Sequence, residues 1–136
     1  MYLAMPTTNA FIRNANGDIL MGKRSTRPGK IYPGLWDIPG GRVEEGEPLE
    51  TALSRELLEE TGLVIVSAKL LHAYHHAGPD IEGSPGINLC YEVQVEGEFS
   101  AEDDLKHLEW VPVDKLPAPE LLAPWTRAHF EFLGLI

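Results

Sequence analysis

Basic side chains are scarce in this 136-residue chain, which carries 11 lysines and arginines against 21 aspartates and glutamates. The formal net charge is -10, whereas a broad nucleic-acid-binding surface needs a stripe of positive charge. We therefore expect no nucleic-acid partner. The deficit does not exclude a small anionic substrate, because bound cations can mediate its contact with an acidic protein.

Cysteine is almost absent: Cys90 is the single thiol, so no internal disulfide can form. This usage is typical of a reducing compartment and predicts a cytoplasmic location. Cys90 lies in the alternating segment INLCYEV, where a packed thiol is expected rather than a nucleophile.

Long apolar runs are missing too. The first residues, MYLAMPTTNAFIRN, lack the basic region and the apolar stretch of a signal peptide. No segment approaches the roughly 20 apolar residues needed to cross a bilayer, so no membrane partner is expected. The remaining composition, 43% hydrophobic and 24% charged, is that of an ordinary globular protein, and its length suggests one domain over residues 1–136.

Hydrophobic alternation and turn signals divide the chain into strands and two helices. Asn16-Gly17 lies between the first two strands and is typical of a tight hairpin. Pro48 suits the first turn of a helix and Gly62 its end, whereas Pro124 is expected to disturb the first turns of a closing helix. This order predicts an α+β sandwich or an α/β/α layering. The expected strands are residues 7–14, 18–25, 36–39, 63–76, 87–97 and 107–113, and the expected helices are residues 48–61 and 119–133.

The first expected helix concentrates carboxylates at a spacing where they repel one another. At about 100° per residue, Glu56 and Glu60 fall within roughly 20° of Leu49, which begins the apolar stripe. Glu59 lies roughly 80° to one side. We therefore expect these side chains to point toward the protein body or into a cleft. A solvated charged face, the ordinary interpretation of a glutamate run, would oppose the apolar stripe.

Carboxylates directed inward need paired charge or metal ions. One arginine, Arg55, cannot neutralise three glutamates, whereas hard divalent cations with oxygen ligands can. Mg²⁺ commonly bridges carboxylates and substrate phosphates, and two such ions can activate a water and stabilise a leaving oxygen. The helix therefore predicts phosphoryl chemistry with Mg²⁺.

The segment from Gly41 to Leu63 resembles the complete Nudix (MutT-like) signature. Its matching positions are Gly41, Glu47, Arg55-Glu56-Leu57, Glu59-Glu60 and Gly62-Leu63. A weaker similarity covers most of the chain, including a strand ending in KR, a loop ending in GLWDIPGG and a strand ending in LEWVPVDKL. The resemblance implies the Nudix fold, a mixed β-sheet sandwiched between α-helices. It also implies hydrolysis of a nucleoside diphosphate linked to another group, with Mg²⁺ or Mn²⁺ as cofactor.

The resemblance also implies roles for individual residues. Arg55 is implied to orient the glutamates, and Glu47 to be a more peripheral carboxylate. Glu56 or a neighbour is a candidate base for the attacking water. The implied metal ligands are Glu56, Glu59, Glu60 and the carbonyl of Gly40. Candidates for a further ligand from a later loop are Glu102, Asp103 and Asp104, for which a solvated turn is the alternative.

Basic and aromatic side chains near the expected cleft are candidates for substrate contacts. Arg24 resembles a phosphate-contacting position of the MutT branch, and Lys23 ends the same strand; a surface charge is the alternative for both. Trp36 could stack on a base, although an aromatic in a short domain more often belongs to the core. Further candidates are Arg27, Lys30, Tyr32 and Tyr74, whereas Trp110 and Trp125 are expected in packing. The cluster of His72, His75 and His76 could bind a transition metal or assist the water, or it could end a strand in solvent.

We expect a pyrophosphohydrolase that converts a nucleoside triphosphate to a monophosphate and pyrophosphate, as a monomer or homodimer. An ADP-ribose or nucleoside diphosphate sugar pyrophosphatase is the main alternative, because Pro79 lies near a proline of some such members. The segment LPAPELLAP lacks the Asn of branches selective for 8-oxo-guanine. A non-catalytic nucleotide sensor is a minor alternative, and the acidic charge disfavours RNA decapping.

Overall fold

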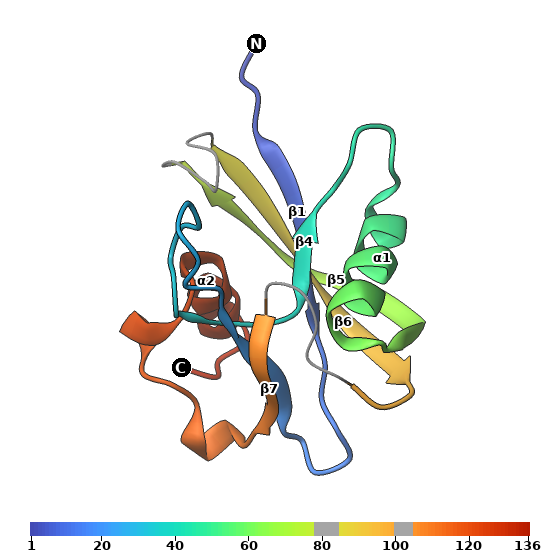
Figure 1. Cartoon of the computed structure of the whole chain (residues 1–136), viewed down its shortest axis with the longest axis vertical. Coiled ribbons are helices and arrows are strands. Elements are labelled where there is room, and N and C mark those ends of the chain that lie inside the picture. Colours follow the sequence, from blue (N-terminus) through green and yellow to red (C-terminus); the bar gives the residue numbers. More distant parts are fainter. Residues whose placement is uncertain (78–84, 100–104) are drawn as a thin grey trace.

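The computed structural model describes residues 1–77, 85–99 and 105–136, and the side chains from 108 onward in the last range. Two helices and two sheets make up the described part of the chain (Figure 1). The elements are β1 (Met5–Phe11), β2 (Ile19–Arg24), β3 (Trp36–Asp37), β4 (Gly40–Arg42), α1 (Leu49–Thr61), β5 (Val64–His76), β6 (Gly86–Glu96), β7 (Leu105–Val111) and α2 (Pro124–Phe132), with 3-10 turns at Val113–Lys115 and Pro119–Leu121.

The larger sheet has the strand order β4-β1-β6-β5, and the smaller sheet has the order β3-β2-β7. Strands β1 and β6 are parallel, whereas β4 and β5 run antiparallel to their neighbours. The larger sheet is therefore mixed, as expected. The sequence did not predict that β2 and β7 would leave it to form a second sheet with β3.

Helices α1 and α2 cover opposite faces of the larger sheet, as the alternation of β1 shows. Ala10 and Ile12 pack in a core with Leu53 of α1, whereas Phe11 between them packs in a second core with Phe130 of α2. A strand directs successive side chains to opposite faces, so β1 contributes to both cores. The expected α/β/α layering is confirmed.

Cys90 is fully buried in the core beneath α2. Burial, and then the charge of Asp37, raise the pKa of its thiol to about 12. The expected packed thiol is confirmed. No helix in the described ranges combines the length and the apolar character required to cross a membrane.

Helix α1 begins and ends where its flanking residues predict. Pro48 is the extended residue before it, and Gly62 ends it in a left-handed conformation with φ of 80°. Thr61 donates a hydrogen bond to the Leu57 carbonyl (2.7 Å) and accepts one from the Leu63 amide (3.0 Å). These bonds satisfy groups at the helix end and direct the chain into β5.

Two expectations about local structure were wrong in part. The turn at Gly17 forms, with its amide bonded to the Asn14 carbonyl (3.0 Å). Beside it the chain pairs through the bridge Arg13–Ile19 and two backbone hydrogen bonds, Asn14 to the Asp18 carbonyl and Leu20 to the Ile12 carbonyl (3.0 Å each), but β1 and β2 enter different sheets. The closing helix starts at Pro124 and not at residue 119. Proline lacks an amide hydrogen, which the first turn of a helix does not need, so Pro124 begins the helix instead of disturbing it.

Candidate active site

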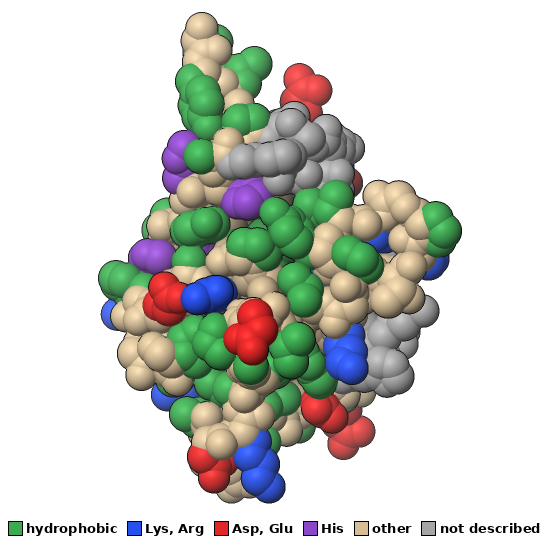
Figure 2. Space-filling view, turned by 90° about the vertical axis from the view of Figure 1, so that its left-hand side faces the viewer, with side chains coloured by type: hydrophobic (Ala, Val, Ile, Leu, Met, Phe, Trp, Pro, Cys, Tyr) green, Lys and Arg blue, Asp and Glu red, His purple; other side chains and the backbone are tan. Residues whose placement is uncertain are grey.

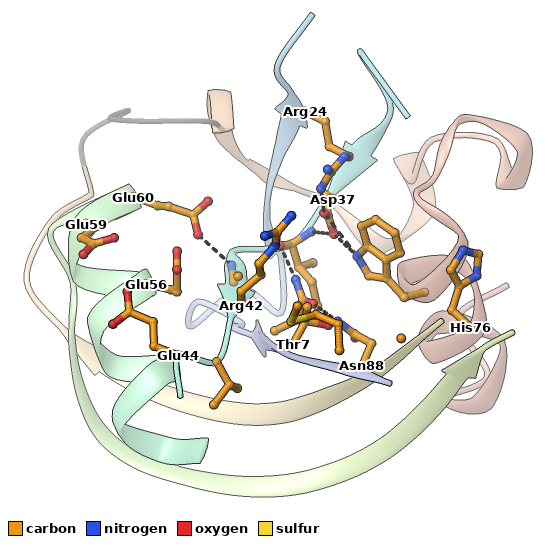
Figure 3. A pocket seen from close by; sticks show the side chains of 18 of the residues that line it. Thr7, Arg24, Asp37, Arg42, Glu44, Glu56, Glu59, Glu60, His76 and Asn88 are labelled. Carbon is orange, nitrogen blue, oxygen red and sulfur yellow. Dashed lines mark hydrogen bonds and ion pairs between the residues drawn. The ribbon is translucent and has the colours of Figure 1, made fainter. Parts of the chain in front are cut away.

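A cleft of about 680 Å³ opens over the edge of the larger sheet where β4 meets α1. Figure 3 shows the glutamates of α1 at one end and Asn88 and His76 at the other. The strand order explains this arrangement, because β4 lies next to α1 whereas β6 and β5 lie further across the sheet. The residues that line the cleft include Thr7, Asn9, Arg24, Lys30, Asp37, Gly40, Gly41, Arg42, Glu44, Glu56, Glu59, Glu60, His76, Asn88 and Trp125.

The three glutamates of α1 face this cleft to different depths. Glu60 is 3% exposed, and its Oε1 accepts a hydrogen bond from the Gly40 amide at 2.9 Å. The side chain of Glu56 is 16% exposed and that of Glu59 is 49% exposed. The expected inward direction is thus confirmed for Glu56 and Glu60, whereas Glu59, the residue offset from the apolar stripe, lines the cleft but is exposed.

Arg55 ties α1 to the loop before it. Its Nε and Nη2 each donate to the Glu47 carboxylate at 2.9 Å, and Nη2 also donates to the Arg42 carbonyl at 3.0 Å. Its Nη1 lies 2.9 Å from Glu56 and 3.6 Å from Glu59. The hydrogen bonds from Arg55 are the largest cause that lowers the pKa of Glu47 to about 2. Glu47 therefore holds the arginine that orients Glu56.

Gly40 and Gly41 bring the backbone of β4 against α1 and β1. A Cβ on Gly41 would overlap the Glu56 carboxylate, 2.7 Å from its Oε1. A Cβ on Gly40 would overlap the Thr8 carbonyl and lie 2.7 Å from Cα of Asn9. Only glycine permits this approach, so the carboxylate of Glu56 rests directly on the β4 backbone.

The oxygen groups at this end suit a hard divalent cation. In the described ranges, however, no three acidic, imidazole or thiol side chains converge as a finished metal site. Glu56 is held by Arg55 and Glu60 by the Gly40 amide, so an ion would have to draw these carboxylates together. The loop candidates Glu102, Asp103 and Asp104 lie outside the described residues, as does Pro79.

Asp37 is a buried carboxylate in the cleft wall that the sequence reasoning missed. It forms an ion pair with Arg24 (3.2 Å) and accepts hydrogen bonds from Trp125 Nε1 (3.1 Å) and Thr126 Oγ1 (2.5 Å). Burial raises the pKa of Asp37, against the lowering effect of the Arg24 charge. Arg24 also stacks on the Trp125 ring, 5.0 Å from its centroid. Trp125 is therefore part of the cleft as well as of the helix packing.

Lys23 and Trp36 lie together but are not among the residues that line the cleft. Their strands pair at this position, and the Lys23 ammonium lies 5.3 Å from the Trp36 ring centroid. Because neighbouring strand residues face opposite ways, Arg24 reaches the cleft and Lys23 does not.

The remaining candidates are distributed over the molecule. Tyr32 contacts the rings of Trp125 and His76, and Trp110 packs on the core beneath α1 as expected. Tyr74 lines a second, shallower hollow beside α2. Lys30 lines the main cleft, and Arg27 is exposed and hydrogen bonds to Ser25.

The three histidines that are close in sequence contact different parts of the structure. His72 bonds to His129 (2.9 Å) and stacks on Phe132, His75 bonds to the Tyr2 hydroxyl (2.7 Å), and His76 lines the cleft. In the described ranges no metal-binding group forms from them.

His129 is a buried histidine that sequence reasoning also missed. Burial, and then the neighbouring His72, lower its pKa from 6.5 to about 3. The imidazole is therefore neutral in the fold, where its Nε2 lies 2.5 Å from the side-chain oxygen Oδ1 of Asn88. No sequence motif signals this contact, because it joins residues on α2 and β6 that are far apart in the chain.

The lowered pKa of His129 predicts a loss of stability in mild acid. Below pH 6.5 the unfolded chain protonates this histidine and the folded chain does not, so the free energy of unfolding falls by about 1.4 kcal/mol per pH unit. Between pH 7 and pH 5 the expected loss is about 2 kcal/mol, measured by urea unfolding. His129→Gln should remove this slope and His72→Gln should retain it. Equal slopes in both variants would contradict the assignment.

The fold and the cleft define a class of protein: a mixed sheet between two helices, with carboxylates of one helix directed into a cleft at the sheet edge. Residues 4–133 match the model of the NUDIX domain family, and the chain belongs to this family. A solved MutT NUDIX hydrolase from Burkholderia pseudomallei is 31% identical with a TM-score of 0.82, covering 95% of this chain and 97% of that one.

Two curated relatives differ in their named activities. An ADP-ribose pyrophosphatase of Methanocaldococcus jannaschii is 39% identical over 100 residues, which cover 73% of this chain and 57% of that protein. An RNA pyrophosphohydrolase of Agrobacterium fabrum is 30% identical over 151 residues, which cover 93% of this chain and 86% of that protein. Likeness alone therefore leaves the substrate open.

Proposed function

We propose that this protein is a divalent-metal-dependent pyrophosphohydrolase that cleaves a nucleoside triphosphate with water, releasing a nucleoside monophosphate and pyrophosphate. The observation that carries the proposal is that the two ends of the cleft differ in the side chains that line them. Its α1 end gathers Glu56, Glu59 and Glu60, while the rest of its 680 Å³ has polar and aromatic walls. A polyphosphate bound through cations at the first end would place its nucleoside at the second.

Glu56, Glu59, Glu60 and the Gly40 carbonyl would hold Mg²⁺ or Mn²⁺, which would neutralise phosphate charge and lower the pKa of an attacking water. Arg55 fixes the direction of Glu56, and Glu56 or a neighbouring glutamate takes the proton of the water. Lys30 and Arg42 line the cleft and supply positive charge along the path of the phosphates. Arg24 lines it too, but its charge is paired with Asp37.

Hydrolysis of ADP-ribose or a nucleoside diphosphate sugar is the second candidate, favoured by the named activity of the M. jannaschii relative. An RNA substrate is less favoured for this chain. The net charge is -10, and on the face seen in Figure 2 the basic side chains are scattered among acidic and apolar ones. A non-catalytic sensor is disfavoured because Arg55 and the three glutamates are all present in the cleft region.

A substrate screen tests the proposal. Purified protein with Mg²⁺ or Mn²⁺ is incubated with nucleoside triphosphates, oxidised deoxynucleoside triphosphates, ADP-ribose and nucleoside diphosphate sugars, and the products are separated by ion-exchange chromatography. We expect a monophosphate and pyrophosphate from at least one triphosphate, and none without metal. Turnover confined to ADP-ribose or sugar nucleotides would replace the proposal by the second candidate.

A further inference from the structure

A hydrogen-bonded network of buried side-chain amides crosses the floor of the cleft between its two ends. Thr7 and Asn9 lie on the same face of β1, and Asn88 lies opposite Thr7 in the register of β1 and β6. The Asn88 amide nitrogen lies 2.6 Å from Thr7 Oγ1 and 2.6 Å from the Asn9 side-chain oxygen. Figure 3 shows Thr7 and Asn88 side by side in the cleft.

Two backbone carbonyls determine which group donates and which accepts in every hydrogen bond of this network. The carbonyls of Ile38 and Pro39 can only accept, and they lie 2.8 and 3.2 Å from the Asn9 side chain. That end of Asn9 must therefore be its nitrogen, and its oxygen must accept from Asn88. The nitrogen of Asn88 is thereby fixed toward β1, with its oxygen toward His129 Nε2 (2.5 Å).

His129 completes the assignment from the other side. Its Nε2 must donate to the Asn88 oxygen, and a neutral imidazole then has a lone pair on Nδ1. Nδ1 lies 2.9 Å from Nδ1 of His72, which therefore donates. Every hydrogen bond in this network therefore points the same way, from the donor His72 to the acceptor carbonyl of Ile38. None of the side chains between them can be flipped without leaving a buried polar group unsatisfied.

Thr7 is the residue through which these fixed hydrogen-bond directions act on the cleft. Asn88 donates to its hydroxyl oxygen, so the hydroxyl hydrogen cannot point back at Asn88. Among the described residues Asn88 is the only hydrogen-bond partner of the Thr7 hydroxyl, and Thr7 lines the cleft. We propose that the Thr7 hydroxyl is a specificity-determining donor that bonds an acceptor atom, a carbonyl oxygen or an unprotonated ring nitrogen, on the base of the nucleotide substrate.

The register of the sheet places Thr7 and Asn88 beside the glutamate end of the cleft. Strands lie about 4.8 Å apart, so β1 is one spacing and β6 about 10 Å from β4, where Gly40 and Gly41 meet the glutamates. A substrate whose phosphates lie against α1 would extend its base over Thr7 and Asn88. This inference rests on the proposed function, because it takes a nucleotide as the occupant of the cleft.

The test compares kcat/KM for purine nucleoside triphosphates with analogues in which N1, N3 or N7 is replaced by carbon or the O6 carbonyl is absent. Wild-type protein should lose about tenfold with the analogue that lacks the atom contacted by Thr7. Thr7→Val should lose the same factor with the parent nucleotide and nothing further with that analogue. Thr7→Ser, which keeps the hydroxyl, should restore the discrimination.

Asn88→Asp tests the direction of the hydrogen bond without removing the hydroxyl. A carboxylate at this position accepts from Thr7 and turns its hydrogen inward, so the variant should discriminate as poorly as Thr7→Val. Circular dichroism and the midpoint of Mg²⁺ activation should match wild type in the Thr7 variants. An equal loss on every analogue, or unchanged discrimination in Thr7→Val, would overturn the inference alone. Absence of triphosphate turnover by wild-type protein would overturn the proposed function and the inference with it.

Discussion

Glu60→Gln should abolish most turnover while leaving the fold intact. Glu60 is 3% exposed, and its carboxylate accepts a hydrogen bond from the Gly40 amide, 2.9 Å away. Glutamine keeps the oxygen that accepts this bond but removes the negative charge that a divalent cation would need. We expect kcat with the best substrate of the screen to fall by about 10²- to 10⁴-fold, as for other single electrostatic or proton-transferring groups.

Thermal unfolding separates this effect from a structural one. A neutral amide costs less to bury than a carboxylate, so the melting temperature of Glu60→Gln should equal or exceed that of wild type. Glu50→Gln is the matched control, because Glu50 is exposed in the first turn of the same helix. Turnover of Glu60→Gln within about threefold of the control would show that Glu60 is no metal ligand.

The acidic helix was readable from the sequence because its signals are local. Pro48 and Gly62 mark its ends, and the 3.6-residue period fixes which side chains share a face. The structure places Glu56 and Glu60 in the cleft, on the side of the buried Leu53 and Leu57. Leu49, from which the sequence measured their direction, is itself exposed. What the period could not give was the partner of each carboxylate, since Gly40 and the loop that carries Glu47 approach only in the folded chain.

The second half of the cleft was not readable, because its contacts join distant strands and helices. Asn88 meets Asn9 across 79 residues and His129 across 41, while Asp37 meets Trp125 across 88. Strand register decides such pairs, and a shift of one residue would turn every side chain to the other face. The one signal available in the sequence was the presence of polar residues such as Asn9 and Asn88 inside segments predicted to be strands.

The histidine cluster illustrates the same difficulty in reverse. His72, His75 and His76 are close in sequence, but β5 directs its side chains alternately, and a register shift lies between Leu70 and His72. His72 thus meets α2 while His75 meets the N-terminal segment. Nearness in sequence predicts nearness of side chains on a helix face more reliably than along a strand.

Gly41→Ala should lose activity but keep its stability, whereas Gly40→Ala should lose stability, although the two residues are adjacent. On Gly41 the added methyl meets the carboxylate of Glu56, the far end of a flexible side chain. That carboxylate can swing aside, so the melting temperature should change by only a few degrees. Its 2.9 Å bond to Arg55 would then be lost, and a misplacement of about 1 Å can cost about 10²-fold in rate. We expect kcat/KM to fall by about 10- to 100-fold.

On Gly40 the methyl meets backbone atoms of β1, the Thr8 carbonyl and Cα of Asn9. These atoms belong to a strand paired with β4 through Asn9 and Gly40, so they cannot yield without opening the sheet. Overpacking of this kind costs about 3 kcal/mol, which lowers the melting temperature by about 10 °C for a chain of this size. Thermal unfolding and kcat/KM measured on both variants check the pair. Full activity in Gly41→Ala would mean that catalysis does not require the Glu56 carboxylate where β4 now holds it, since the methyl group leaves it no room to stay.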